Sequence, residues 1–386
     1  MESILEKDDL LHCLYLVQGV VERRSSLPIL SHVLIESGEG YISLRATDLE
    51  VGIRQQCKAT VKKEGAVTTD ARKLYEIIRE LPPDRVALRS TGNGWVEVSS
   101  GRSRFRMASL DPKEFPAIVS VPATQSDGEG KKHPVTVSIA GQTLKEMIEK
   151  TLFAASPDES RPNLSGVYLE ARTAGKGQKN GRLRMVSSDG HRLSLIERES
   201  VGAIPSTWPS AILPRKGLIE ARKLLEKGEE TTELAIHGST LNITKESTEL
   251  SMRLVEGDFP DYNQVLPTEK NHVISFSRED LFSALRRLLI LTTERSRGVK
   301  IQIEKEKMEI SVNTPDLGEG VEEIAVDYNG DNLIVGFNGR YLVEMLNVLE
   351  EEQKISFLIK DESSPCLIKV EKDEDFSYVV MPMRIF

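Results

Sequence analysis

The chain repeats one order of elements three times, at intervals of about 125 to 145 residues. Each copy opens with apolar residues at helical spacing, in the segments 8–21, 142–155 and 278–291. A strand-like run, a second strand with a tight polar turn, another helical pattern and a closing pair of strands follow in the same order. Because a chain that repeats a whole fold usually builds a symmetric object, this repeat constrains the architecture more than any single motif.

The order of elements within each copy predicts an α+β domain, with two helices packed on one face of an antiparallel sheet. The second helices are expected at 71–81, 215–225 and 339–349, and the first strands at 29–35, 164–169 and 299–303. A polar stretch without periodicity at 123–132 is typical of a linker, and 267–271 is a second candidate. We therefore predict three domains, at 1–122, 133–267 and 271–386.

The bulk composition is that of an ordinary soluble protein, with 39% hydrophobic and 29% charged residues. No apolar run approaches the roughly 20 residues of a membrane span, and the first residues lack the regions of a signal peptide. Cys13, Cys57 and Cys366 form no CxxC pair, so we expect free thiols in a reducing cytosol. The formal net charge of −9 argues against nucleic-acid binding unless basic residues gather locally.

The most enzyme-like string is Ser-Asp-Gly-His-Arg at 188–192, in which Asp189 and His191 could act as an acid–base pair. The alternative is a turn, because Asp supports an Asx turn and Gly adopts positive φ. The string occupies the same place in the repeat as 46–49 and 313–316, which favours the turn. The six histidines are dispersed and no glycine-rich phosphate loop is present, so we expect no catalytic residue, metal or cofactor.

Basic residues mark the polar faces or ends of five of the six predicted helices. One such helix would simply be solvated, but five favour a shared positive surface. Basic groups without interleaved aromatic residues suit contact with a phosphate backbone, not base reading or single-strand stacking. The sixth helix, at 339–349, contributes only Arg340 and carries Glu344. The basic residues of the other five are Arg23, Arg24, Arg72, Lys73, Arg79, Lys145, Lys150, Arg215, Lys216, Arg222, Lys223, Arg286 and Arg287.

The C-terminal run 378–386 is apolar almost to its last residue, which is unusual for a chain end. Residues 378–380 fit a final core strand. Met381, Pro382 and Met383 are harder to bury, because proline interrupts strand pairing and methionine suits adaptable binding surfaces. The end of the chain therefore either completes the core alone or contributes to a groove for short apolar peptides.

Several of these strings together resemble the beta subunit of bacterial DNA polymerase III, the sliding-clamp family. They are Ser-Leu-Pro-Ile-Leu at 26–30, Thr-Asp-Leu-Glu at 47–50, Ser-Asp-Gly-His-Arg-Leu at 188–193, Phe-Pro-Asp-Tyr at 259–262, Arg-Gly-Val at 297–299 and the ending at 378–385. The resemblance runs in order from residue 8 to the end, so it covers nearly the whole chain.

The resemblance implies a DNA clamp fold: a head-to-tail dimeric ring of three similar domains per chain, with helices around the hole and sheets on the rim. The function implied is that of a non-catalytic subunit of the polymerase III holoenzyme, a DNA-directed DNA polymerase. Such a processivity factor encircles duplex DNA without sequence preference, slides freely and tethers the polymerase during DNA replication. The alternatives are a hydrolase acting through Asp189 and His191, and a peptide-binding adaptor that never touches DNA.

The partners implied are double-stranded DNA, a second copy of the chain, the replicative polymerase alpha subunit, the clamp loader, other polymerases and repair proteins. The proteins would dock through short linear motifs, in the cytoplasm and away from any membrane. Gln264, Ser296 and Asn163 depart from the family's pattern, and Phe386 adds a bulky residue to the tail, so the preferred motif stays open.

Carried over position by position, the resemblance and the basic helix faces assign three sets of site residues. DNA contacts are expected at Arg24, Arg72, Lys73, Lys145, Arg215 and Arg297. The subunit contact is expected at Phe105, Ile290 and Leu291. The partner-peptide pocket would comprise Leu164, Ser188, Gly190, His191, Arg192, Leu193, Pro260, Val265, Tyr341, Ser364, Val379, Val380, Met381, Pro382, Met383 and Arg384.

Overall fold

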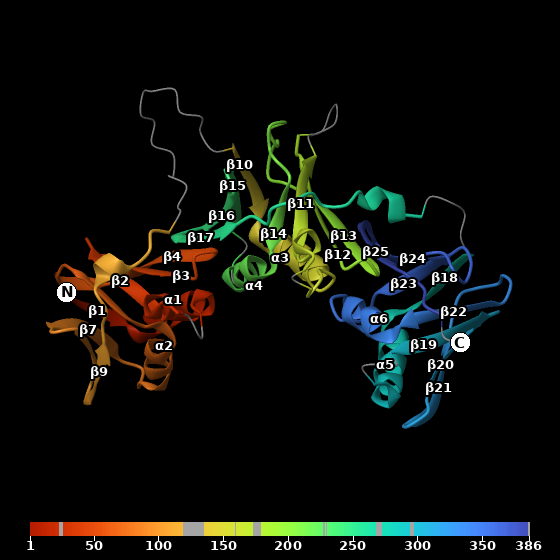
Figure 1. Cartoon of the computed structure of the whole chain (residues 1–386), viewed down its shortest axis with the longest axis horizontal. Coiled ribbons are helices and arrows are strands. Elements are labelled where there is room, and N and C mark those ends of the chain that lie inside the picture. Colours follow the sequence, from red (N-terminus) through yellow and green to blue (C-terminus); the bar gives the residue numbers. More distant parts are fainter. Residues whose placement is uncertain are drawn as a thin grey trace.

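The structure is a computed structural model and describes residues 1–22, 26–118, 135–158, 160–172, 179–226, 228, 230–267, 272–293 and 297–384. Its elements form an open crescent, with the first repeat at one end, the second in the middle and the third at the other end (Figure 1). The helices lie along the concave side and the sheets lie behind them along the convex side. The predicted α+β architecture of three similar units is therefore confirmed.

Each repeat supplies two α-helices at the positions that apolar spacing predicted. They are α1 Lys7–Val20, α2 Ala71–Glu80, α3 Gly141–Leu152, α4 Arg215–Leu224, α5 Arg278–Leu288 and α6 Gly339–Leu346. Side-chain caps begin some of them: the Asp70 carboxylate accepts a hydrogen bond from the Lys73 backbone N–H at 2.7 Å. The predicted ends lay one to three residues too far along the chain, and in the third repeat α5 passes into the 3₁₀ turn Leu289–Leu291.

The strands follow the repeat as well. The first repeat contains β1 Glu2–Glu6, β2 His32–Gly38, β3 Tyr41–Thr47, β4 Val51–Lys58, β5 Thr60–Lys63, β6 Ala66–Asp70, β7 Arg85–Gly92, β8 Trp95–Ser100 and β9 Ser103–Ala108. The second contains β10 Val135–Ala140, β11 Gly166–Arg172, β12 Arg182–Ser188, β13 Arg192–Glu199, β14 Ala211–Pro214, β15 Thr231–His237, β16 Thr240–Lys245 and β17 Thr248–Arg253. The third contains β18 His272–Ser277, β19 Gly298–Glu304, β20 Lys307–Thr314, β21 Gly318–Ala325, β22 Leu333–Asn338, β23 Lys354–Ile359, β24 Cys366–Val370 and β25 Asp373–Val380.

Two of the predicted strand starts were wrong. The strand expected from residue 29 is preceded by the 3₁₀ turn Pro28–Ser31, and the strand expected from residue 164 by the turn Pro162–Leu164. Each turn begins at a proline, whose fixed φ suits the first position of a helical turn and whose missing N–H cannot enter a ladder. The apolar residues that follow both prolines were mistaken for strand residues.

Strand pairing joins the repeats edge to edge. The last strand of the second repeat, β17, pairs antiparallel with β4 of the first, with Ser251 opposite Gly52. The last strand of the third repeat, β25, pairs in the same way with β13 of the second, with Val379 opposite Leu193. Each joint therefore makes one eight-stranded sheet from two repeats. The same two kinds of strand, a last strand and a fourth strand in the repeat, meet at both joints.

The counterparts of the joint strands lie at the two ends of the crescent. In the first repeat, the last strand β9 is an edge strand of the sheet β5-β1-β7-β8-β9. In the third repeat, β21 occupies the place of β4 and β13 and is an edge strand of the sheet β21-β20-β19-β22. Among the described residues, each of these edges has a strand partner on one side only.

The helices pack on the sheets through their apolar faces. Leu10, Leu14 and Val17 of α1 are fully buried, and α1 packs mainly on β3 and β4, as the helical spacing predicted. Gly19 of α1 faces the Glu220 carboxylate of α4, so a larger residue there would have to displace the end of that side chain. Within the described parts of the chain, no helix has both the length and the apolar character needed to cross a bilayer.

Candidate functional site

The turn that looked most like a catalytic centre is an Asx turn at the joint between the second and third repeats. Oδ1 of Asp189 accepts hydrogen bonds from the backbone N–H groups of His191 at 2.9 Å and Arg192 at 3.1 Å. Asp48 makes the corresponding turn in the first repeat, accepting from Glu50 at 2.9 Å and Val51 at 2.6 Å. The turn interpretation is therefore confirmed, and the aspartates serve to fold the chain back at each joint.

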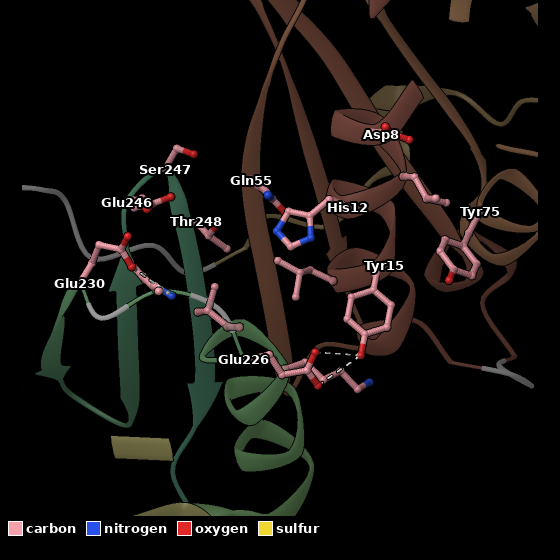
Figure 2. Close-up of a pocket in the computed structure, with 16 residues that line it drawn as sticks. Asp8, His12, Tyr15, Gln55, Tyr75, Glu226, Glu230, Glu246, Ser247 and Thr248 are labelled. Atoms are coloured by element: carbon pink, nitrogen blue, oxygen red, sulfur yellow. Dashed lines mark hydrogen bonds and ion pairs between the residues drawn. The ribbon is translucent and has the colours of Figure 1, made fainter. Parts of the chain in front are cut away.

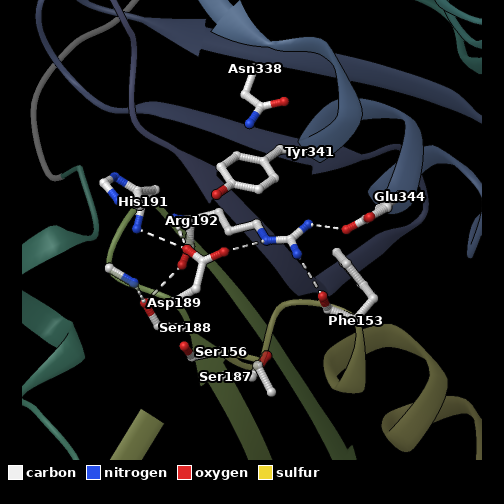
Figure 3. Close-up of polar contacts among 12 residues, drawn as sticks. Phe153, Ser156, Ser187, Ser188, Asp189, His191, Arg192, Asn338, Tyr341 and Glu344 are labelled. Atoms are coloured by element: carbon white, nitrogen blue, oxygen red, sulfur yellow. Dashed lines mark hydrogen bonds and ion pairs between the residues drawn. The ribbon is translucent and has the colours of Figure 1, made fainter. Parts of the chain in front are cut away.

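Arg192 is the centre of the contacts across this joint (Figure 3). Its guanidinium donates to Oδ2 of Asp189 at 3.0 Å, to Oε2 of Glu344 at 2.6 Å and to the Phe153 carbonyl at 2.7 Å. The guanidinium carbon also lies 4.3 Å from the centre of the Tyr341 ring. Because the side chain is only 6% exposed and fully engaged, Arg192 fastens α6 of the third repeat to the second repeat.

The C-terminal tail continues from β25 over the same joint. The Met381 N–H donates to the His191 carbonyl at 2.8 Å, and the Met383 N–H donates to the Gly336 carbonyl at 2.9 Å. Met381 and Met383 keep 37% and 40% of their surface exposed. The tail is thus held along its backbone while its methionine side chains face solvent, as expected for an adaptable binding surface.

A separate apolar cluster lies in the same sheet and reaches Val379, just before this tail begins, and it is distinct from the core that the helices cover. Its buried members are Val186, Leu193, Leu195, Tyr262, Leu367 and Val379. The segment that connects the second and third repeats, with the 3₁₀ turn Tyr262–Val265, passes over this side of the sheet (Figure 1). Tyr168 and Phe259 stack at 5.1 Å between ring centres, and Val265 is 38% exposed. The joint therefore carries an apolar surface with a partly exposed rim.

The residues expected in the peptide pocket fall into an exposed and a buried group. Arg192, Leu193, Val379 and Val380 are buried and form the floor or the joint itself. Leu164, Ser188, Tyr341, Ser364 and Pro382 are half-buried, and Gly190, His191, Pro260, Val265, Met381, Met383 and Arg384 are exposed around them. Of the three departures from the family's pattern, Asn163 donates to the Asp258 carbonyl at 3.3 Å and Gln264 donates to Asp261 at 3.2 Å. Ser296 and Phe386 lie outside the described residues.

Of the residues expected to contact DNA, Arg72 and Lys73 lie on α2, Lys145 on α3 and Arg215 on α4, whereas Arg297 directly precedes β19. Lys73 and Arg215 are exposed, while Arg72, Lys145 and Arg297 are half-buried. Arg24 lies outside the described residues. Lys150, which the sequence analysis counted among the basic residues of a shared positive surface, is buried and held by Glu146 and Asp373 at 2.7 Å each. That expectation was wrong because a carboxylate one turn earlier on α3 and a second one on β25 enclose the ammonium group.

The residues expected at the subunit contact lie at the two ends of the crescent. Phe105 is on the edge strand β9 and is 40% exposed. Ile290, in the 3₁₀ turn after α5, is 77% exposed, and Leu291 is half-buried. Across the residues that the structure describes, no group of three or more His, Cys, Asp or Glu is placed to hold a metal ion.

Sequence reasoning missed the fastening of the first joint. Lys216 of α4 donates to the Asp48 carboxylate and, at 3.0 Å, to the Val20 carbonyl at the end of α1. The two ends of this contact are 168 residues apart, so no local pattern reveals it. The repeat offered the one available signal, because Asp48 and Asp189 stand at the same place in their copies.

Comparison with known proteins assigns nearly the whole chain to one protein family. Models of the N-terminal, central and C-terminal domains of the DNA polymerase III beta subunit match residues 1–119, 138–261 and 263–384. The chain is 34% identical to the beta sliding clamps of Pseudomonas aeruginosa and Caulobacter vibrioides, and each comparison covers the full length of both sequences.

Solved structures agree with this match. A DnaN sliding clamp from Bartonella birtlesii, bound to griselimycin, is similar with a TM-score of 0.90 and 30% identity. The DNA polymerase III subunit beta of Pseudomonas aeruginosa is similar with a TM-score of 0.87 and 34% identity. Each comparison covers all of this chain and all of the other.

Proposed function

Since the chain belongs to the DNA polymerase III beta subunit family and is a non-catalytic sliding clamp of DNA replication, we propose that two copies close into a ring around duplex DNA. The ring slides along the duplex and tethers the polymerase to it. The observation that carries this proposal is the repeated joint: β17 meets β4 and β25 meets β13, which leaves β9 and β21 as the matching pair of edges.

Pairing β9 of one copy with β21 of the other would repeat the joint a third time. The two edges carry opposite charge, with Arg104 and Arg106 on β9 against Glu319, Glu322 and Glu323 on β21. Opposite charges on facing strands favour the pairing, and like edges of two copies would repel. A head-to-tail contact made twice by two copies closes the ring and leaves neither β9 nor β21 unpaired. Phe105, Ile290 and Leu291 would supply the apolar part of this contact.

The DNA would pass along the concave side, against the helices (Figure 1). Lys73 and Arg215 present exposed cationic groups there, and Arg24, Arg72, Lys145 and Arg297 are proposed to add to them. Contacts of this kind with phosphates are sequence-independent and weaken with salt. An overall charge of −9 keeps the attraction loose, which suits a ring that holds DNA by enclosure and must still slide.

We propose that the apolar surface at the joint between the second and third repeats is the partner-peptide pocket. The exposed Met381 and Met383, together with the apolar cluster that contains Leu193 and Val379, suit a short motif anchored by leucine or an aromatic residue. The replicative polymerase alpha subunit, the clamp loader, other polymerases and repair proteins would compete for it. We further propose a cytoplasmic location and domain limits of 1–122, 133–267 and 271–386.

Retention on circular DNA tests the ring. The chain, loaded on nicked circular DNA, should stay bound through a wash at high salt and leave when the circle is cut. An open or monomeric binder would instead release with salt, whether or not the circle is intact. A peptide-binding adaptor would be retained on neither the intact circle nor the cut DNA, so the same experiment tests that alternative function.

A further inference from the structure

A cleft of about 590 Å³ lies at the joint between the first and second repeats, and nothing described above uses it (Figure 2). It is lined by α1 and α2 on one side and by the end of α4 and the β16–β17 turn on the other. Its apolar lining comes from Leu11, Tyr15, Leu16, Tyr75 and Leu224. Both walls belong to one chain, so the cleft does not depend on ring closure.

The rim of this cleft is acidic. Asp8, Glu226, Glu230 and Glu246 are all exposed around it. The two lysines of the lining offset only part of this charge, because just one of them pairs with a rim acid. Lys223 contacts Glu220, which is outside the cleft, at 2.8 Å, and the buried Lys245 lies 3.6 Å from Glu230. The cleft therefore attracts a positively charged ligand.

One buried acceptor in the cleft has no donor. Gln55 is only 6% exposed, and its Oε1 makes no hydrogen bond to any described residue. Figure 2 shows its amide beside His12, between the two walls. A buried polar atom without a partner is costly and calls for an explanation, and a ligand N–H group would supply one. This acceptor is independent of the acidic rim and points to the same class of ligand.

We propose that this cleft binds a short basic segment of a partner protein, with an arginine or lysine next to a bulky apolar residue. The apolar residue and the alkyl stem of the cation would cover Leu11, Tyr15 and Tyr75, which are half-buried, while the charged head meets the acidic rim. An N–H group of the segment would face Gln55. This site lies at the first joint, whereas the proposed partner-peptide pocket lies at the second, so a partner can engage both at once.

Fluorescence anisotropy with a labelled peptide tests the proposal on the intact chain. The probe is Leu-Arg-Leu-Arg with an N-terminal fluorescein and a C-terminal amide, and Leu-Glu-Leu-Glu is its charge-reversed partner. We expect saturable binding of the first peptide that weakens between about 50 and 300 mM salt, and no binding of the second. Equal binding of both peptides would overturn the proposal, because the acidic rim would then have no role.

Variants locate the binding. Glu226→Gln with Glu246→Gln should weaken binding about five- to tenfold, since two exposed carboxylates are lost. Gln55→Met should weaken it about threefold to tenfold through the lost acceptor. The matched control, Glu362→Gln with Glu371→Gln, changes net charge equally on exposed acids of the third repeat and should bind as the wild type.

Two further outcomes complete the test. Met383→Ala alters the proposed partner-peptide pocket and should leave binding unchanged. Loss of binding in that variant, or wild-type binding by the Glu226 and Glu246 variant, would place the peptide elsewhere and refute the proposal. A melting temperature and a sedimentation profile for every variant show whether a loss reflects unfolding, because Gln55 lies on the joint strand β4.

Discussion

Lys216 of α4 and Asp48 of the β3–β4 turn form an ion pair that fastens the second repeat to the first. At the other joint, Asp189 stands in the same turn, but its cation is Arg192 from its own strand, and Glu344 of α6 completes the link. The two joints therefore share their strand pairing and their aspartate while differing in where the cation comes from. This difference makes the two joints separately testable.

Replacing Lys216 with methionine should loosen the first joint. Asp48 would keep a buried carboxylate whose side chain is 6% exposed, but it would lose its cation. Because the lysine side chain is 41% exposed, we expect a loss of about 1 to 2 kcal/mol in the free energy of unfolding. Urea unfolding measures this change. Lys73→Met breaks an exposed pair with Glu76 and should leave the urea midpoint nearly unchanged.

Replacing Arg192 with lysine should damage the second joint more severely. A lysine keeps the charge but cannot donate at once to Asp189, Glu344 and the Phe153 carbonyl. We expect a loss of about 2 to 4 kcal/mol and faster hydrogen exchange at the Met381 amide, which is bonded to the neighbouring His191 carbonyl. Unchanged exchange at Met381 would show that the tail is held independently of the joint. Arg384→Lys, on the exposed tail, is the matched control.

Charge exchange across the proposed subunit contact should control the oligomeric state. Arg104→Glu with Arg106→Glu places acidic residues on β9 against the acidic β21, so the chain should sediment as a monomer. Adding Glu319→Arg and Glu323→Arg should restore a dimer, although a weaker one. A variant that stays dimeric after the first pair of changes would contradict the β9–β21 pairing. Phe105→Asp should also weaken the dimer, through its apolar part.

Acid should weaken the joint between the second and third repeats. Burial alone would raise the pKa of Glu146 and of Asp373, but hydrogen bonds from Arg198 and Lys150 outweigh it and hold both pKa values below their ordinary range. A lowered folded-state pKa contributes stability above the unfolded-state pKa, near 4.5 for Glu146 and 3.8 for Asp373. That stability is lost as the pH falls through the lowered values.

The measurement is the urea midpoint of unfolding between pH 7 and pH 3. We expect it to fall steeply below about pH 4 in the wild type. Asp373→Asn removes one of the two titrating groups, so its midpoint should start lower at pH 7 and fall less on acidification. A parallel fall in both proteins would mean that this cluster does not set the acid sensitivity.

The helices and turns were predictable because their sequence signals are local. The joints between repeats were not predictable, since the residues that meet there are far apart in the sequence. Apolar spacing located every described helix to within three residues at its end, and the turn chemistry of Asp48 and Asp189 was legible in the sequence. Pro28 and Pro162 could have corrected the two strand starts. The burial of Lys150 depends on Asp373, which is 223 residues away. The unpaired Oε1 of Gln55 becomes a feature of a cleft only when the first and second repeats meet. Resemblance supplied the site positions that periodicity could not.

The two amide bonds that hold the tail bear on how tightly a partner can dock. Met381 and Met383 are already tied to His191 and Gly336 by the chain itself. At the proposed partner-peptide pocket, an arriving motif would meet a main chain that is already ordered, so no affinity would be lost in ordering it. Selectivity among competing partners would then depend on how their side chains fit the flexible thioether side chains of Met381 and Met383. One ordered stretch of backbone could therefore bind many different partners in turn.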